Sequence, residues 1–181
     1  MVTRSGFYVK GNLIIQRIVY IDWDLGFTKE AKHEYVRRVI TELGTDVGKA
    51  VDVTSASPIY QARSLSPFYL KDVVTGKSVE DYLSELNSKS NCNVFQIPGL
   101  ADYHYLRNLT EVNKETINTY DCFIDVFHNP DKCYGNTQAL SLAVYKVLQY
   151  KGKLDLLELG TEVEFLDWYN TQLSFCTEVV D

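Results

Sequence analysis

A glutamate at the start of a predicted helix is the strongest candidate for acid–base chemistry in this sequence. Ser78 precedes Val79 and Asp81 in a pattern close to a capping box, which predicts that a helix begins here. Because helical residues advance by about 100° each, Glu80 and Asn87 share a ledge at the border of the apolar face. Partial desolvation on such a ledge raises the pKa of a carboxylate toward the range of a general acid or base. The alternative is a first-turn glutamate that only complements the helix dipole.

The polar loop upstream of this helix contains side chains that suit a phosphorylated ligand. Arg63 has a forked guanidinium that matches the geometry of phosphate or carboxylate. Ser66 can donate a hydrogen bond to a ribose or phosphate oxygen. Tyr69 can stack on a base or form a wall of a pocket. The alternative is a turn-rich loop whose aromatic residues pack into the core.

A second polar block follows the apolar start of a predicted strand over residues 123–127. Asp125 lies in this strand, and Asn129 lies in the turn after it, where a side chain can hydrogen-bond to the backbone. Asn136 and Gln138 lie at the predicted N-terminus of the next helix, where free backbone amides attract anions. These four residues are candidates for ligand binding, and turn formation and helix capping are the structural alternative.

These two blocks resemble the NADAR domain and, more closely, a NADAR-related family of small bacterial and phage proteins. The first block, LSPFYL followed by TGKSVEDY, is similar to the family's LSAFNL followed by VESAFQGSKVF. The second block, FIDVFHNP followed by NTQA, is similar to FTDIEFNPKKSINCQARA. The family binds or cleaves ADP-ribose-like nucleosides, so the resemblance implies a NADAR-like fold with a pocket for an ADP-ribose-type nucleotide.

The chain departs from the family at the position of a lysine that, in the NADAR fold, is implicated in attack on the ribose. Asn87 occupies this position. Lys89 is the nearest lysine, and it falls on the flank opposite Glu80 if the helix continues that far. Lys89 can therefore serve as the nucleophile only if the helix ends before it. The chain also lacks the glutamine that follows the family's glutamate, and part of the family's pocket wall is missing after residue 99.

Two ligand-binding functions and one structural function are compatible with these residues. In the first, the protein is an N-glycosidase that cleaves a ribosyl–base bond, with Glu80 as the acid–base catalyst and Lys89 as the nucleophile. Arg63 and Ser66 then hold the phosphate and the ribose. In the second, the pocket sequesters or senses a NAD-derived nucleotide without chemistry, as a phage or defence-related component would. In the third, the pocket has collapsed and the domain is structural or binds a protein partner.

The rest of the sequence predicts the elements that must position these side chains. Apolar residues on both sides of a Lys10-Gly11-Asn12 turn predict a β-hairpin over residues 7–23. Capping residues and apolar spacing predict further elements: helices over 28–44, 78–86, 101–120, 136–152 and from Thr161, with a strand over 50–54. Helices outnumber strands and the two do not alternate regularly. This pattern favours one α+β domain over residues 1–181, mostly helical with a small antiparallel β portion.

Composition limits the partners of this 181-residue chain. A net charge of -6 argues against general binding to a nucleic-acid backbone, which needs clustered Lys and Arg. The chain has neither a signal-peptide pattern nor an apolar run near the ~20 residues that a membrane span needs, so we expect a cytoplasmic protein that does not enter a membrane. The cysteines and histidines lack metal-ligand spacing, so we expect neither a metal nor another cofactor.

Overall fold

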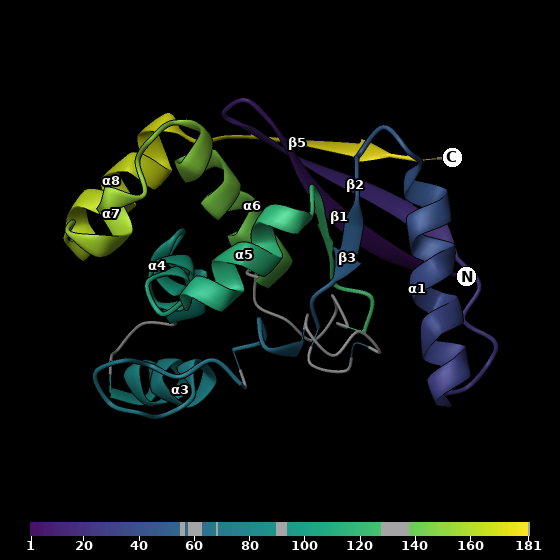
Figure 1. The fold of residues 1–181 in the computed structure, drawn as a ribbon, viewed down its shortest axis with the longest axis horizontal. Helices are drawn as coiled ribbons and strands as arrows, with labels where there is room; N and C mark the ends of the chain where they lie inside the picture. Colours follow the sequence, from purple (N-terminus) through teal and green to yellow (C-terminus); the bar gives the residue numbers. More distant parts are fainter. Residues whose placement is uncertain (55–56, 58–62, 68, 90–93, 128–137, 181) are drawn as a thin grey trace.

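The protein has a mixed α/β architecture in which helices lie on both faces of a sheet (Figure 1). The computed structural model describes residues 1–54, 57, 63–67, 69–89, 94–127 and 138–180. In these residues the strands are β1 Val2–Lys10, β2 Leu13–Ile21, β3 Ala50–Asp52, β4 Cys122–Ile124 and β5 Ser174–Val179. The helices are α1 Lys29–Leu43, α3 Val79–Lys89, the 3-10 helix η1 Val94–Gln96, α4 Leu100–Leu106, α5 Glu111–Thr119, α6 Gln138–Tyr150, α7 Asp155–Glu158 and α8 Glu162–Gln172. This mixture agrees with the predicted α+β class.

The predicted hairpin is present and is longer than its apolar pattern suggested. β1 and β2 pair antiparallel along their whole length, with Lys10 opposite Leu13. Gly11 has a φ of 64°, which a glycine adopts without strain at the first position of a two-residue hairpin turn. The turn therefore fixes the register of the two central strands of the sheet.

The sheet is mixed rather than antiparallel, with the strand order β3-β4-β1-β2-β5. β1 pairs antiparallel with β2 and β4, whereas β3 pairs parallel with β4 and β2 pairs parallel with β5. The predicted antiparallel portion is present in these β1 pairs, whereas the parallel pairs were not predicted, because both join segments that are far apart in the sequence. A long helical crossover between β3 and β4 lets the second strand enter in the same direction as the first.

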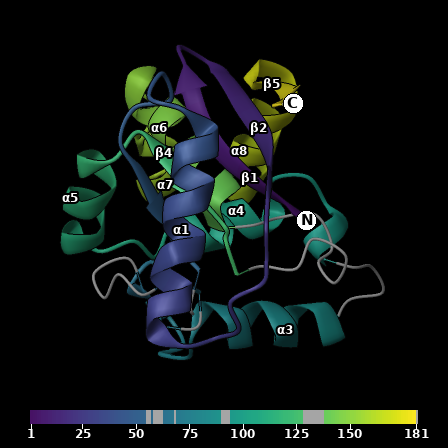
Figure 2. The ribbon, with the colours of Figure 1, turned by 90° about the vertical axis from the view of Figure 1, so that its right-hand side faces the viewer.

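The two faces of the sheet have different covers, because successive residues of a strand point to opposite sides. Phe7 and Ile14 belong to a core that includes α4, α6 and α8. Tyr8 and Ile15 belong to a second core that includes α1. Figure 2 shows α1 in front of the strands, with α6 and α8 behind them. The sheet thus lies between a single helix and a larger helical layer.

Three predicted helix starts are confirmed by their capping bonds. Thr28 accepts a hydrogen bond from the amide of Ala31 at 3.1 Å, and α1 follows it. Ser78 accepts one from the amide of Asp81 at 3.1 Å, at the start of α3. Thr161 accepts from the amide of Glu164 at 3.2 Å before α8. Each bond satisfies one of the amides that a helix leaves free at its N-terminus. The predicted N-cap of α6 falls outside the described residues.

The predicted helix over 101–120 is two helices, α4 and α5. The amide nitrogen Nδ2 of Asn108 donates to the carbonyl of His104 at 2.7 Å and so closes the last turn of α4. Thr110 and Asn113 then form a capping box that starts α5 in a new direction. The apolar spacing of a helix continues across this break, so it gave no sign of it. The signal that the prediction missed was the polar side chains here, which compete with the helical backbone for hydrogen bonds.

The C-terminal segment after α8 forms β5, a strand that was not predicted from the sequence. Arg17 of β2 explains how this acidic segment is held, since its guanidinium donates to Glu178 of β5 at 2.9 Å. The same guanidinium donates to Asp46, and to the carbonyl of Leu43 at the end of α1, at 2.8 Å each. Arg17 therefore ties β5 and the end of α1 to the middle of the sheet.

Candidate functional site

The carboxyl ends of the parallel strands β3 and β4 bring two buried aspartates to one edge of the sheet. Asp52 is the last residue of β3 and is fully buried. Asp125 follows the last residue of β4 and is 5% exposed. Asp52 pairs with Ile124 on the α1 face, and Asp125 lies near Tyr105, which belongs to the opposite core. In open sheets with parallel strands, this edge is the usual place for a ligand crevice.

The carboxylate of Asp52 holds the chain in place directly after β3 and after β4. Its Oδ1 accepts a hydrogen bond from the amide of Val126 at 3.0 Å. The hydroxyl of Thr54 donates to its Oδ2 at 2.8 Å, and Ser57 adds a further side-chain bond. Burial outweighs these bonds and raises the pKa of Asp52 to about 6. The predicted strand over 123–127 ends at Ile124, and the amide of Val126 serves this carboxylate instead of a neighbouring strand.

Arg63 begins the next described segment and lies against Ser57 at this edge. The Nε of Arg63 donates a hydrogen bond to the carbonyl of Ser57. The chain then turns tightly, because the amide of Ser66 donates to the carbonyl of Arg63, and the amides of Tyr69 and Leu70 donate to the carbonyl of Ser66. We call the described residues 63–67 and 69–70 the Arg63 strip.

Tyr105 of α4 fixes the Arg63 strip to the helical layer. Its hydroxyl donates to the carbonyl of Leu65, and both Leu65 and Ser66 are fully buried. Burial and, after it, the negative charge of Asp125 raise the pKa of Tyr105, which keeps this phenol a neutral donor. The strip is therefore part of the core on one side, and Asp125 lies near the same tyrosine.

Glu80 joins the other end of the Arg63 strip. Its amide donates to the carbonyl of Pro67 at 3.0 Å, and the neighbouring amide of Val79 donates to the carbonyl of Leu70 at 2.8 Å. The side chain of Glu80 is half-buried. Burial and then the charge of Asp81 raise the pKa of Glu80. The structure thus connects Glu80, Arg63 and the buried Asp52 through one continuous series of hydrogen bonds.

The two residues proposed on the far end of α3 are placed differently. Asn87 accepts a hydrogen bond from the amide of Val94 at 2.8 Å, so its side chain holds the start of η1. Lys89 is the last residue of α3, and the helix does not end before it. Nine residues at about 100° each place Lys89 half a turn away from Glu80. The condition under which Lys89 could attack a ligand beside Glu80 is therefore not met.

The remaining candidates lie near the edge or outside the described chain. Tyr69 is 56% exposed and belongs to the Arg63 strip. The side chain of Gln138, at the start of α6, donates to the carbonyl of Val53 at 3.4 Å, directly after β3. Asn129 and Asn136 fall outside the described residues. The structure thus gathers Arg63, Ser66, Glu80, Asp125 and Gln138 around one region.

Sequence reasoning missed the most extensively bonded polar residue of this region. Asp52 lies in a short alternating segment that indicated a strand, and an aspartate in a buried strand is rare unless it is paired. Its apolar neighbours on both sides were the signal that could have indicated a buried, hydrogen-bonded carboxylate. Its partner Val126 lies 74 positions along the chain, and no local pattern reveals such a contact.

No family model matches the chain, and no curated protein matches it either. Among the helices of the described ranges, none has both the length and the apolar composition that crossing a membrane requires. In the same residues, no three His, Cys, Asp or Glu side chains are grouped so that they could hold a metal ion.

Proposed function

We propose that the chain is a NADAR-like protein that binds an ADP-ribose-type nucleotide at the carboxyl ends of β3 and β4. The observation that carries this proposal is the series of hydrogen bonds that joins Asp52, Arg63 and Glu80. These residues come from three segments that are separate in the sequence. Side-chain chemistry suggests a phosphate-binding role for Arg63, and the resemblance implies a role for Glu80. This series passes through the backbones of Ser57 and Glu80, and it places Arg63 between the segments that carry Asp52 and Glu80.

Arg63 supplies the anchor for the diphosphate. Its Nε donates a hydrogen bond to the carbonyl of Ser57. In the described part of the chain, the two terminal nitrogens of its guanidinium have no hydrogen-bond partner. Two parallel N–H groups suit a phosphate, which accepts bidentate bonds. Tyr69 supplies an exposed ring for the base.

N-glycosidic hydrolysis is the second candidate, and the half-buried carboxylate of Glu80 favours it. A carboxylate with a raised pKa can accept a proton from a water molecule near neutral pH. That water attacks the anomeric carbon, the bond to the base breaks, and the base leaves with the bonding electrons and takes up a proton. Lys89 has no part in this version, because it lies on the opposite flank of α3.

A thermal-shift titration with ADP-ribose tests the binding proposal. We expect ADP-ribose to raise the melting temperature in a concentration-dependent manner, and adenosine, which lacks the diphosphate, to have a weaker effect. Arg63→Ala should weaken ADP-ribose binding about tenfold or more. If the alanine variant is unstable, Arg63→Gln removes the same positive charge while it keeps much of the side-chain volume.

Arg37→Ala is the matched control, because Arg37 is an exposed residue of α1. It should bind ADP-ribose as the unmodified chain does. The binding proposal is wrong if ADP-ribose leaves the melting temperature unchanged, or if both arginine variants respond alike. Incubation with ADP-ribosyl-guanosine followed by chromatography then separates the two candidates. Released guanosine and ADP-ribose indicate hydrolysis of the bond that joins them, and an intact ligand indicates binding alone.

A further inference from the structure

A cavity lies among α4, α5, α6 and α7, and its lining residues differ from those of the proposed nucleotide site. Its volume is about 310 Å³, at the small end of the roughly 300–1,000 Å³ that ligand sites occupy. Its apolar wall consists of leucines: Leu106, Leu109, Leu154 and Leu157. Leu106 is 2% exposed, so this wall is part of the core, whereas Val73 at the rim is 72% exposed. The cavity is therefore an apolar recess that is open to solvent on one side.

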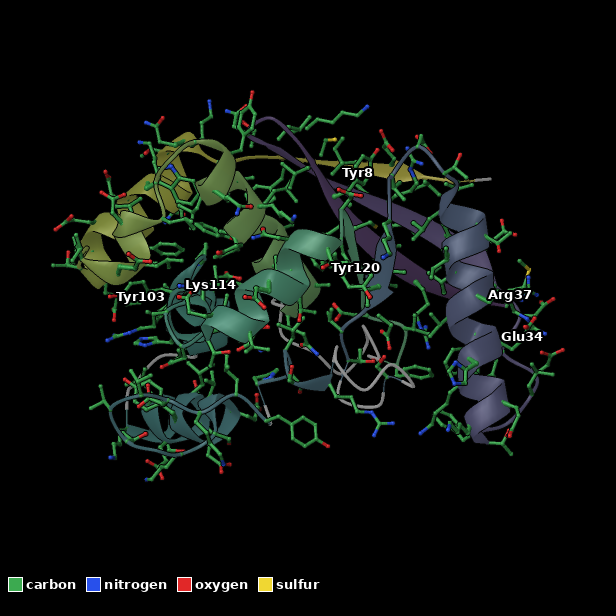
Figure 3. All side chains as sticks on the ribbon, in the orientation of Figure 1. Tyr8, Glu34, Arg37, Tyr103, Lys114 and Tyr120 are labelled. Carbon is green, nitrogen blue, oxygen red and sulfur yellow. The ribbon has the colours of Figure 1, made fainter. Side chains whose placement is uncertain are left out.

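Two cations line the cavity together with one carboxylate. Lys114 extends from α5 toward α7, where its Nζ lies 3.7 Å from Glu158 (Figure 3). Glu111, one turn earlier on α5, lies 3.1 Å from the same Nζ. The side chains of Glu158 and Glu111 are 61% and 87% exposed, whereas that of Lys114 is 25% exposed. Exposed ion pairs contribute little, so these glutamates can turn to water when another anion reaches Lys114. Arg107 provides the second positive charge.

Tyr145 of α6 adds a phenol hydroxyl to the cavity. The residue is 2% exposed and lines the cavity. Over the described ranges its hydroxyl has no hydrogen-bond partner, and its oxygen still reaches solvent, since it is not among the fully buried atoms without a partner. Burial raises the pKa of Tyr145, so the hydroxyl remains a neutral donor. Lys114, Arg107 and Tyr145 thus offer hydrogen-bond donors beside an apolar wall.

We propose that this cavity binds a small monocarboxylate with an apolar tail, such as a short fatty acid or an aromatic acid. Its carboxylate accepts hydrogen bonds from Lys114 and Tyr145, with Arg107 at the rim, and its tail lies against the leucines. An alcohol of the same length gains only the apolar contact. An amine of the same length is protonated, so it offers no acceptor to Lys114 or Tyr145, and of the lining side chains only the exposed carboxylate of Glu158 attracts it.

Titration of the ¹⁵N-labelled full chain with hexanoate, hexanol and hexylamine tests this site. We expect hexanoate to shift the amide signals of Leu109 and Leu157 at concentrations at which the other two compounds do not. Lys114→Gln should weaken hexanoate binding about tenfold, because it removes a charge-assisted bond. Tyr145→Phe removes only the hydroxyl, leaves the packing of the ring in place, and should weaken binding severalfold.

Two control variants separate these effects from general ones. Lys29→Gln removes an exposed lysine at the start of α1, and Tyr150→Phe removes a hydroxyl from a 69%-exposed ring at the end of α6. Both should bind hexanoate as the unmodified chain does. Equal shifts with hexanol and hexanoate, shifts confined to other parts of the chain, or unchanged affinity in Tyr145→Phe would each overturn the proposal. The experiment does not depend on ADP-ribose binding, so either proposal can fail alone.

Discussion

The backbone amide of Glu80 donates a hydrogen bond to the carbonyl oxygen of Pro67 at 3.0 Å. This bond uses an amide that the N-terminus of a helix leaves free, and it fixes the Arg63 strip against the first turn of α3. It involves only the backbone of Glu80. The carboxylate can therefore be neutralised by substitution without loss of the contact that positions it.

Glu80→Gln should leave the stability of the fold within about 0.5 kcal/mol, because no described hydrogen bond or ion pair of the carboxylate holds the fold. In the unmodified chain, affinity for ADP-ribose should fall as pH rises through the raised pKa of Glu80, because the ionised carboxylate repels the diphosphate. The glutamine variant should lack this part of the pH dependence of affinity, and it should lose any hydrolysis. Calorimetric titration of both proteins with ADP-ribose between pH 5 and pH 8 measures the pH dependence. Glu85→Gln, on the same helix, is the control and should keep the pH dependence.

Asp52→Ala should destabilise the protein by about 2–4 kcal/mol, since it leaves the buried amide of Val126 and the hydroxyl of Thr54 without their acceptor. Asp52→Asn keeps one acceptor oxygen and should cost less. Urea unfolding at pH 7 measures both variants. Asp167→Ala, at an exposed position of α8, should stay within about 0.5 kcal/mol. Equal stability of Asp52→Ala and Asp167→Ala would contradict the organising role of Asp52.

Asp102 should make the protein less stable as pH rises from about 4 to about 6. It is fully buried in α4, accepts a hydrogen bond from Ser141, and has a pKa raised to about 6 by burial. An unfolded chain releases this proton near pH 4, so in this window the native state binds more protons and its stability falls. Its contribution is complete below pH 4 and is lost above pH 6.

Asp102→Asn should remove this dependence. The stability of the unmodified chain relative to this variant should drop by about 2 kcal/mol between pH 4.5 and pH 7, at about 1.4 kcal/mol for each unit of pKa shift. Urea unfolding at both pH values measures the change. A relative stability that is the same at both pH values would show that the pKa of Asp102 is not raised. Asp167→Asn should show no such change.

Gly99→Ala should be more destabilising than Gly76→Ala, although both glycines have a positive φ, of 87° and 73°. A methyl group at Gly99 would lie 2.8 Å from the ring of Tyr169, whereas no atom lies within 4 Å of one at Gly76. We expect a cost of about 1 kcal/mol at Gly76 from the backbone alone. Overpacking should add about 1–3 kcal/mol at Gly99. Thermal unfolding compares the two, and equal costs would mean that Tyr169 moves aside freely.

Local chemistry in the sequence was sufficient to predict several elements of the fold. Thr28, Ser78 and Thr161 begin helices because a side-chain oxygen satisfies an amide two or three residues away, and such a bond needs no distant partner. The hairpin followed in the same way from a glycine turn between two apolar runs. The half-buried position of Glu80 followed from helical spacing once the start of α3 was known.

The sequence by itself determined which segments become helices or hairpin strands and which face of each is apolar. Only the tertiary structure decided that β3 and β4 pair in parallel and that β5 joins the sheet through Arg17. It also decided that Asp52 lies beside Val126 and that Lys89 stays on the far flank of α3. The physical reason is that these outcomes depend on contacts between residues far apart in the chain. The free energy of these contacts depends on burial and on charge pairing that arise only when the layers pack. Caps and turns depend instead on neighbours that are always close in the chain.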